Sequence, residues 1–250
     1  MSLPPEDVYD VSVGHYCQWP ALAVDSRGWV WVAMVANFAE RREDGQPLRH
    51  FNGLWVKVRG PQRADPELLS SPGDVVWAPA IAAAGEDMWA VWMAWREGRW
   101  SLVARRWHDG AWQPAIDLTP AAGHHLHPAL AADEAGLWLA WQHMHEGRQQ
   151  VMLGRLEAGA KSLSSVTALS AELPDSHRPA LTLAADGMLW AAWDVYAAGE
   201  YRAVAGPVTD GRCAAQVVGG EGVFNGHCSL AAGADGTVWL AWYRRQALDA

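Results

Sequence analysis

The chain has 250 residues, half of them hydrophobic, with 28 acidic against 19 basic side chains and a formal net charge of −9. This charge argues against a surface for nucleic acid or anionic membranes, because both need clustered lysine and arginine. No apolar run approaches the roughly 18 residues that cross a bilayer, so no membrane insertion is expected. Residues 1–14 lack the basic start and apolar stretch of a signal peptide.

One phrase returns five times along the chain. It reads PALAVDSRGWVWVAMV from Pro20 and PAIAAAGEDMWAVWMAW from Pro79, and it recurs from Pro128, Pro179 and, in weaker form, Cys228. The starts lie 49 to 59 residues apart. A period near 50 residues made of short strand-like pieces is typical of a β-propeller with one four-stranded blade per repeat. We predict a single all-β domain over residues 1–250, a β-propeller of about five blades with four antiparallel strands each.

The two ends of the chain bear on ring closure. Glu6 to Val13 stands where an outer strand stands relative to the next inner strand, so we predict that it pairs in the last blade. The fifth repeat stops at Ala250, before its third strand should begin. Either the fifth blade is incomplete, or the chain is a piece of a longer protein with further domains.

The third repeat serves as the template for one blade. Residues 128–132 predict the inner strand, Asp133 to Gly136 a turn, and Leu137 to Gln142 an alternating second strand. Gln150 to Leu156 predicts the third strand. Ser162 to Leu169, β-branched and polar, predicts the exposed outer strand.

Tryptophan is unusually abundant, with seventeen in the chain, and eight of them form four Trp–x–x–Trp pairs. Residues three apart on a strand face opposite sides, so each pair sends one ring toward each neighbouring blade. A stripe of rings also suits sugar stacking, but recurrence at one position of nearly every blade favours packing. The pairs are Trp89/Trp92, Trp138/Trp141, Trp190/Trp193 and Trp239/Trp242, with Trp31/Met34 in the first repeat.

The three cysteines, Cys17, Cys213 and Cys228, have neither disulfide-framework nor zinc spacing. Cys17 and Cys228 precede the first and fifth inner strands, which a closed ring would make neighbours. A disulfide between them is the alternative to the favoured reading of three buried thiols.

The mouth of the central channel is the predicted ligand site. Residues just before each inner strand and just after each Trp–x–x–Trp pair converge there, and pockets form where loops meet on a rigid scaffold. The opposite face receives Asp–Gly hairpin turns, from which no chemistry is inferred. The predicted ligand-binding residues are Trp19, His127, His177, Arg178, Asp194, Tyr196, His227 and Tyr243.

Three of these residues, His127, His177 and His227, invite a metal hypothesis, because a ring of blades can aim several imidazoles at one axial point. The first two repeats carry Trp19 and Ala78 instead of histidine. We therefore favour histidines that form a hydrogen-bonding lid, and we predict no metal and no other cofactor. His124 and His125 are read as solvated loop residues.

Asp194 is the best acidic candidate, with Tyr196 two residues further on. Paired with Glu97 or Glu146 across the mouth, it would form the two-carboxylate arrangement of a glycosidase. The alternative is that acidic residues in these hairpins are simply solvated. Ser-His-Asp and phosphate-loop motifs are absent from the sequence.

The repeat pattern P-A-L-A-x-D-x-x-G-x-x-W-x-A-W resembles the repeats of sialidase-like (BNR-type) propellers, and propeller segments attached to secreted bacterial hydrolases. The sialidase Asp-box, S-x-D-x-G-x-T-W, is only approximated from Ala234 to Trp239. The resemblance covers all five repeats and implies a bacterial protein whose parent is secreted or extracytoplasmic. It implies the fold and not an activity, because the residues that sialidase catalysis requires have no counterparts that the sequence identifies.

Three functions remain open on the sequence. The first is a binding propeller that recognises a glycan or a small polar ligand at the mouth, and it is favoured because no acid–base constellation stands out. The second is a glycoside hydrolase or sialidase-like enzyme that uses Asp194 and a second carboxylate. The third is a structural module of a larger secreted protein.

Overall fold

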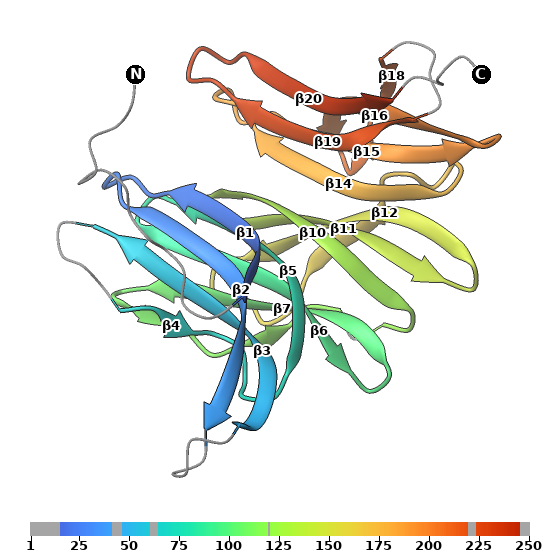
Figure 1. Cartoon of the computed structure of the whole chain (residues 1–250). Helices are drawn as coiled ribbons and strands as arrows, with labels where there is room; N and C mark the ends of the chain where they lie inside the picture. Colours follow the sequence, from blue (N-terminus) through green and yellow to red (C-terminus); the bar gives the residue numbers. More distant parts are fainter. Residues whose placement is uncertain (1–15, 42–46, 61–64, 120, 220–223, 246–250) are drawn as a thin grey trace.

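The computed structural model describes residues 16–41, 47–60, 65–119, 121–219 and 224–245, and in them it contains strands and no helix (Figure 1). The inner strands β1, β5, β10, β14 and β19 contact one another in sequence order. The first four each begin a separate sheet, and β19 pairs antiparallel with the strand that follows it, so the repeat of about 50 residues does correspond to one blade. The β-propeller prediction is confirmed.

Three blades have separate sheets. The first contains β1 (Tyr16–Val24), β2 (Val30–Arg41), β3 (Pro47–Arg59) and β4 (Glu67–Leu68). The second contains β5 (Val75–Ala84), β6 (Asp87–Arg96), β7 (Arg99–His108), β8 (Ala111–Trp112) and β9 (Ile116–Asp117). The third contains β10 (His124–Asp133), β11 (Gly136–His145), β12 (Arg148–Glu157) and β13 (Ser164–Ala168), close to the strands predicted from the template.

The fourth and fifth blades share one sheet. The fourth contains β14 (Ser176–Leu183), β15 (Leu189–Ala197), β16 (Glu200–Thr209), β17 (Arg212–Cys213) and β18 (Gln216–Val218). The fifth contains β19 (Phe224–Ala232) and β20 (Val238–Arg245). A short parallel pairing, Tyr201 with Phe224, joins β16 to β19. Within the described residues the fifth blade therefore has two strands; the predicted strand from Glu6 to Val13 lies outside them.

Tryptophan packing between blades is confirmed for the first three repeats and for Trp193 of the fourth. Trp31 and Trp92 share the cluster between the first and second blades, and Trp89 and Trp141 share the next one. The first ring of each pair thus faces the following blade and the second ring faces the preceding blade. Trp239 departs from this pattern, because 67% of its surface is exposed where its counterpart Trp89 is buried. The prediction of a buried pair is wrong for the fifth blade.

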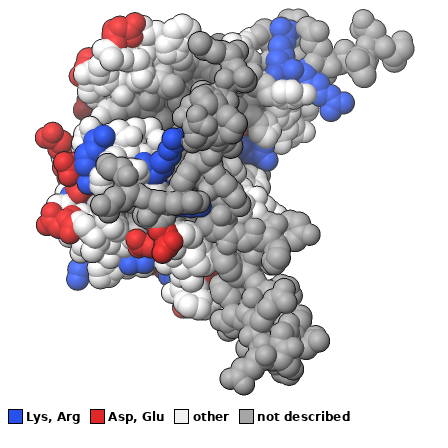
Figure 2. Space-filling model, turned by 60° about the vertical axis from the view of Figure 1, so that its left-hand side comes forward, with Lys and Arg blue, Asp and Glu red and all other residues white. Residues whose placement is uncertain are grey.

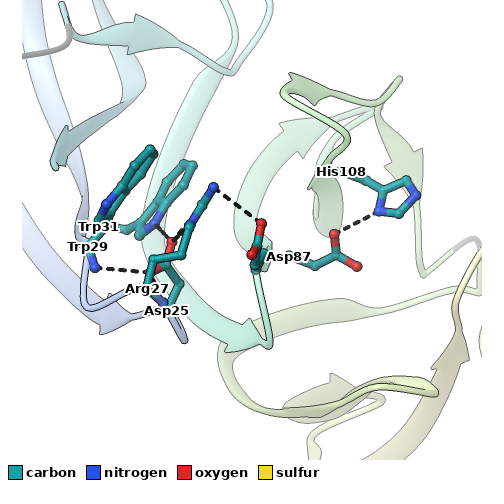
Figure 3. A network of polar contacts seen from close by, with 7 residues as sticks. Asp25, Arg27, Trp29, Trp31, Asp87 and His108 are labelled. Carbon is teal, nitrogen blue, oxygen red and sulfur yellow. Dashed lines mark hydrogen bonds and ion pairs between the residues drawn. The ribbon is translucent and has the colours of Figure 1, made fainter. Parts of the chain in front are cut away.

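The hairpin turns on the face opposite the mouth are held by their aspartates, as Asp25 illustrates (Figure 3). One carboxylate oxygen of Asp25 accepts the backbone N–H groups of Arg27 at 3.0 Å and Trp29 at 2.9 Å. The other accepts the indole N–H of Trp31 at 3.0 Å. Burial raises the pKa of Asp25, but the bonds from Arg27, Trp31 and Trp29 outweigh it and leave the pKa below its usual value.

The cysteines and the surface charge complete the description. No disulfide joins Cys17, Cys213 and Cys228; Cys17 is exposed, so the expectation of three buried thiols is wrong at that position. Acidic and basic side chains are interspersed over the described surface in the view of Figure 2. No helix of the described chain is long and apolar enough to cross a bilayer.

Candidate ligand site at the channel mouth

Every inner strand carries the same irregularity where it enters the sheet. Pairing with the second strand skips two residues, and the first of the two has a left-handed backbone conformation. The second is proline in four blades, and proline has no N–H to lose from the ladder. The five left-handed residues are Trp19 (φ 54°), Ala78 (φ 41°), His127 (φ 50°), Arg178 (φ 48°) and His227 (φ 57°).

These five bulges converge on one pocket. Its lining consists of the five left-handed residues and the residue that follows each of them, and its volume is about 420 Å³. A left-handed conformation costs a non-glycine residue about 1–2 kcal/mol. Strain of this kind persists where the surrounding structure over-determines it, and it is often found at binding sites.

A side chain from the preceding blade supports three of the bulges. The backbone N–H of His127 donates to Sδ of Met93 at 3.4 Å, and that of Arg178 donates to Oε1 of Gln142 at 3.3 Å. The N–H of His227 donates to Oδ2 of Asp194 at 3.1 Å. Met93, Gln142 and Asp194 all follow the second ring of a repeat, so the geometry of each pocket residue depends on its neighbouring blade.

Asp194 lies beneath the pocket wall, with only 1% of its surface exposed. A Cβ built on Gly226 would stand 2.9 Å from its carboxylate, so glycine is what allows the fifth strand to approach it. Burial raises the pKa of Asp194 above its usual value, against the bond from the His227 N–H. Burial of the Cys228 thiol, together with the nearby Asp194 carboxylate, raises the pKa of Cys228 to about 12.

The polar wall of the pocket is formed by Arg178 and His227. Nη1 of Arg178 lies 2.6 Å from Nε2 and 3.0 Å from Nδ1 of the His227 ring, and both side chains are exposed. His127 faces them from the third blade. Burial, together with the charges of Arg178, His177 and His227, lowers the pKa of His127 to about 4, so this ring is neutral at pH 7.

A chain of rings adjoins the pocket on the fourth and fifth blades. Ring centroids are 4.8 Å apart for Tyr196 and Tyr201, 5.0 Å for Tyr201 and Phe224, and 5.5 Å for Phe224 and His227. His177 contacts Tyr201, and Tyr243 contacts Phe224. Across the pocket, Trp19 packs against Trp77 at 5.4 Å. Tyr196, Tyr243 and Trp19 remain exposed, which leaves aromatic faces open around the mouth.

The structure places the predicted residues in three groups. Trp19, His127, Arg178 and His227 line the pocket. His177, Tyr196 and Tyr243 belong to the adjoining rings, and Asp194 lies below. Tyr201 and Phe224, which link these groups, were not among the predicted ligand-binding residues.

Four residues considered in the sequence do not line the pocket: Glu97, Glu146, His124 and His125. Glu97 and Glu146 occupy left-handed positions, each followed by a left-handed glycine, in the exposed hairpin turns after β6 and β11. The prediction that His125 is solvated is wrong: it is buried, and its Nδ1 accepts the Trp141 indole N–H at 3.0 Å. His124 is half-buried and stacks on Trp95. Among the described residues, no three His, Cys, Asp or Glu side chains are placed to hold a metal ion.

Comparison with known proteins bears on the fold alone. No protein-family model and no curated protein matches the sequence. A Dyadobacter fermentans protein of unknown function matches with a TM-score of 0.68 and 13% identity over 92% of this chain and 72% of its own. An endo-arabinase from Bacteroides thetaiotaomicron matches with a TM-score of 0.59 and 13% identity, over 90% of this chain and 88% of its own.

A third solved structure, Trypanosoma rangeli sialidase in complex with sialic acid, has a TM-score of 0.54 and 16% identity, over 82% of this chain and 38% of its own. These similarities support the β-propeller fold. At such identities they carry over neither an activity nor a set of site residues.

Proposed function

We propose that this protein is a glycan-binding β-propeller that holds one or two sugar units in the mouth of the channel. The observation that carries the proposal is the convergence of five strained bulges on a single pocket of about 420 Å³. Arg178, His227 and His127 offer directional hydrogen bonds, and the exposed rings of Trp19, Tyr196 and Tyr243 offer flat apolar faces. Sugars present both kinds of surface, hydroxyl groups at the edge and C–H groups on the ring face.

The similar structures support this ligand class, because they include an endo-arabinase and a sialidase in complex with sialic acid. The differences between blades support it as well, because a site for an asymmetric ligand needs different groups on its different sides. Here the first blade supplies an indole, the third an imidazole and the fourth a guanidinium.

A glycan array followed by calorimetry on the best ligand tests the proposal. Substitution of Arg178→Ala with His227→Ala should weaken binding by about a hundredfold, as expected for loss of two polar contacts of roughly 1–1.5 kcal/mol each. Arg212→Ala, an exposed arginine on the outer part of the same blade, is the matched control and should leave affinity unchanged. Equal affinity of the double variant and the control would place the ligand elsewhere.

A second candidate, a glycosidase, is favoured by the environment of Asp194. Burial raises the pKa of this carboxyl group, which is the property that lets a carboxylic acid donate a proton near neutral pH. A panel of aryl glycosides tests it: turnover by the wild type that is lost in Asp194→Asn, with glycan binding retained, would establish catalysis. Turnover that survives in the variant would remove Asp194 from any catalytic role.

A further inference from the structure

A second cavity, of about 650 Å³, lies between the second and third blades. It is at the end of the molecule opposite the mouth, because β7 begins beside the mouth at Arg99 and reaches the cavity at His108. The second blade supplies Arg106, His108 and the segment 113–117, and the third blade supplies residues 159–161. We call it the seam groove. Its size is within the range of about 300–1,000 Å³ that is usual for small-molecule sites.

Two cationic groups line the seam groove. The Arg106 guanidinium donates through Nη2 to Asp87, and its side chain is 17% exposed. Lys161, from the third blade, adds an exposed ammonium group on the other side of the groove.

Asp87 also fixes the orientation of a histidine in this groove. Nδ1 of His108 lies 2.7 Å from Oδ1 of Asp87 (Figure 3), and Nε2 of the same ring lies 3.4 Å from Asp109. Burial raises the pKa of Asp87, but the bonds from His108 and Arg106 outweigh it and hold the pKa below its usual value. The carboxylate therefore stays charged and the ring stays aligned at neutral pH.

An equivalent cavity between the fourth and fifth blades shows that the fold does not require these charges. There Trp190 and Pro207 occupy the paired positions that Trp89 and Arg106 occupy at the seam groove. That cavity, of about 230 Å³, has a lining of apolar side chains and the single amide of Gln216. The same architecture thus forms the cavity with no charged residue.

We propose that the seam groove is a second ligand site, specific for a small organic acid. The carboxylate of the ligand pairs with the guanidinium of Arg106 and the ammonium group of Lys161, and its body rests on the apolar wall formed by Pro114 and Ile116. Charge-assisted bonds of this kind are the stronger class of hydrogen bond. The acidic residue of the lining, Asp117, is already engaged, since it accepts the Thr119 N–H at 3.2 Å and lies 3.8 Å from Arg96.

Titration of the full chain with benzoate, benzyl alcohol and inorganic phosphate, followed by calorimetry and NMR, tests this proposal. Benzoate should bind, and Lys161→Gln and Arg106→Gln should each weaken it about tenfold, the effect of losing roughly 1.4 kcal/mol. The matched control is Arg155→Gln in the third blade. Arg155 likewise donates to an aspartate, Asp133, and lies over a tryptophan, Trp138, at 4.8 Å, but it does not line the groove.

Each other outcome overturns the proposal. Lys161 is exposed, so an unchanged benzoate affinity in Lys161→Gln, with the fold intact, would show that the groove does not hold the carboxylate. Equal losses in Arg106→Gln and Arg155→Gln would assign the effect to blade stability. Binding of benzyl alcohol or phosphate as tight as that of benzoate would rule out specificity for an organic acid. Loss of benzoate binding in Arg178→Ala would move the site to the mouth.

Discussion

The carboxylate of Asp194 holds the backbone N–H of His227, a residue of the next blade that lines the pocket. Gln142 does the same for Arg178, and the thioether of Met93 does so for His127. A carboxylate, an amide and a sulfur share one position of the repeat because the position requires only an acceptor. Asp194, the best acidic candidate in the sequence, therefore serves first of all to hold the backbone of His227 in the next blade.

Replacing this support should loosen the fifth blade. Asp194→Ala leaves the part-buried N–H of His227 without its acceptor, so the free energy of unfolding should fall by about 1 kcal/mol in urea titrations. Asp194→Asn keeps a carbonyl oxygen and should lose less. A loss in Asp194→Ala no greater than in Asp194→Asn would show that the bond contributes little.

The raised pKa of Asp194 predicts a dependence of stability on pH. Between its unfolded value near 3.8 and the higher folded value, the folded state binds more protons than the unfolded state, so the free energy of unfolding falls as pH rises. Asp194→Asn removes this group from the balance. The difference in stability between variant and wild type should thus shift in favour of the variant as pH rises, and an unchanged difference would argue against a raised pKa.

Asp25 predicts the opposite dependence. Its folded pKa is lowered, so its contribution is fully present above the unfolded value near 3.8 and is lost as pH falls through the folded value. Asp25→Asn should lower the free energy of unfolding at pH 7 and flatten its decline in acid. Chemical denaturation at several pH values measures both effects, with Asp186→Asn at an exposed turn as the control.

The left-handed conformation of Ala78 offers a test of strain at the mouth. Glycine adopts φ near 41° freely, so Ala78→Gly should change stability by no more than about 1 kcal/mol and in the stabilising direction. Ala80→Gly, at a regular position of the same strand, should cost about 0.5–1 kcal/mol. Equal losses in the two variants would show that the bulge is not strained.

Tryptophans of the Trp–x–x–Trp motif differ in burial, so their replacement should lower the free energy of unfolding by different amounts. Trp141 is 3% exposed, and Trp141→Ala should destabilise the protein by about 3–5 kcal/mol. Trp239 is largely exposed, and Trp239→Ala should cost less than about 1 kcal/mol. Thermal unfolding of the two variants side by side compares them; similar melting temperatures would contradict the difference in burial.

The sequence was sufficient for the blades because strand alternation, turn glycines and paired rings recur with the repeat. It was also sufficient to bring Trp19, His127, Arg178 and His227 to one mouth, since their place before each inner strand is periodic. The left-handed bulge was not foreseen, although His127–Pro128 and Arg178–Pro179 mark it, because a residue before proline usually takes an extended conformation.

Other parts of the site depended on contacts that no local pattern encodes. His125 resembled a loop residue, yet it is buried against Trp141 of the neighbouring strand. Arg106 and Lys161 are 55 positions apart and belong to different blades, so only the packing of one blade on the next brings them to a common groove. The exposure of Trp239 and Trp242 in the fifth blade could not be predicted either, because these rings repeat the sequence pattern of the buried pairs.

That open face gives the protein a built-in optical reporter. Indole fluorescence is sensitive to solvent. The rings of Trp31, Trp89, Trp92, Trp141 and Trp193 are shielded, whereas Trp239, Trp242, Trp19 and Trp95 are exposed. Acrylamide should therefore quench a red-shifted part of the emission and spare the blue-shifted remainder. Whatever comes to cover the fifth blade in solution should register as a decrease in that quenchable fraction, without any label.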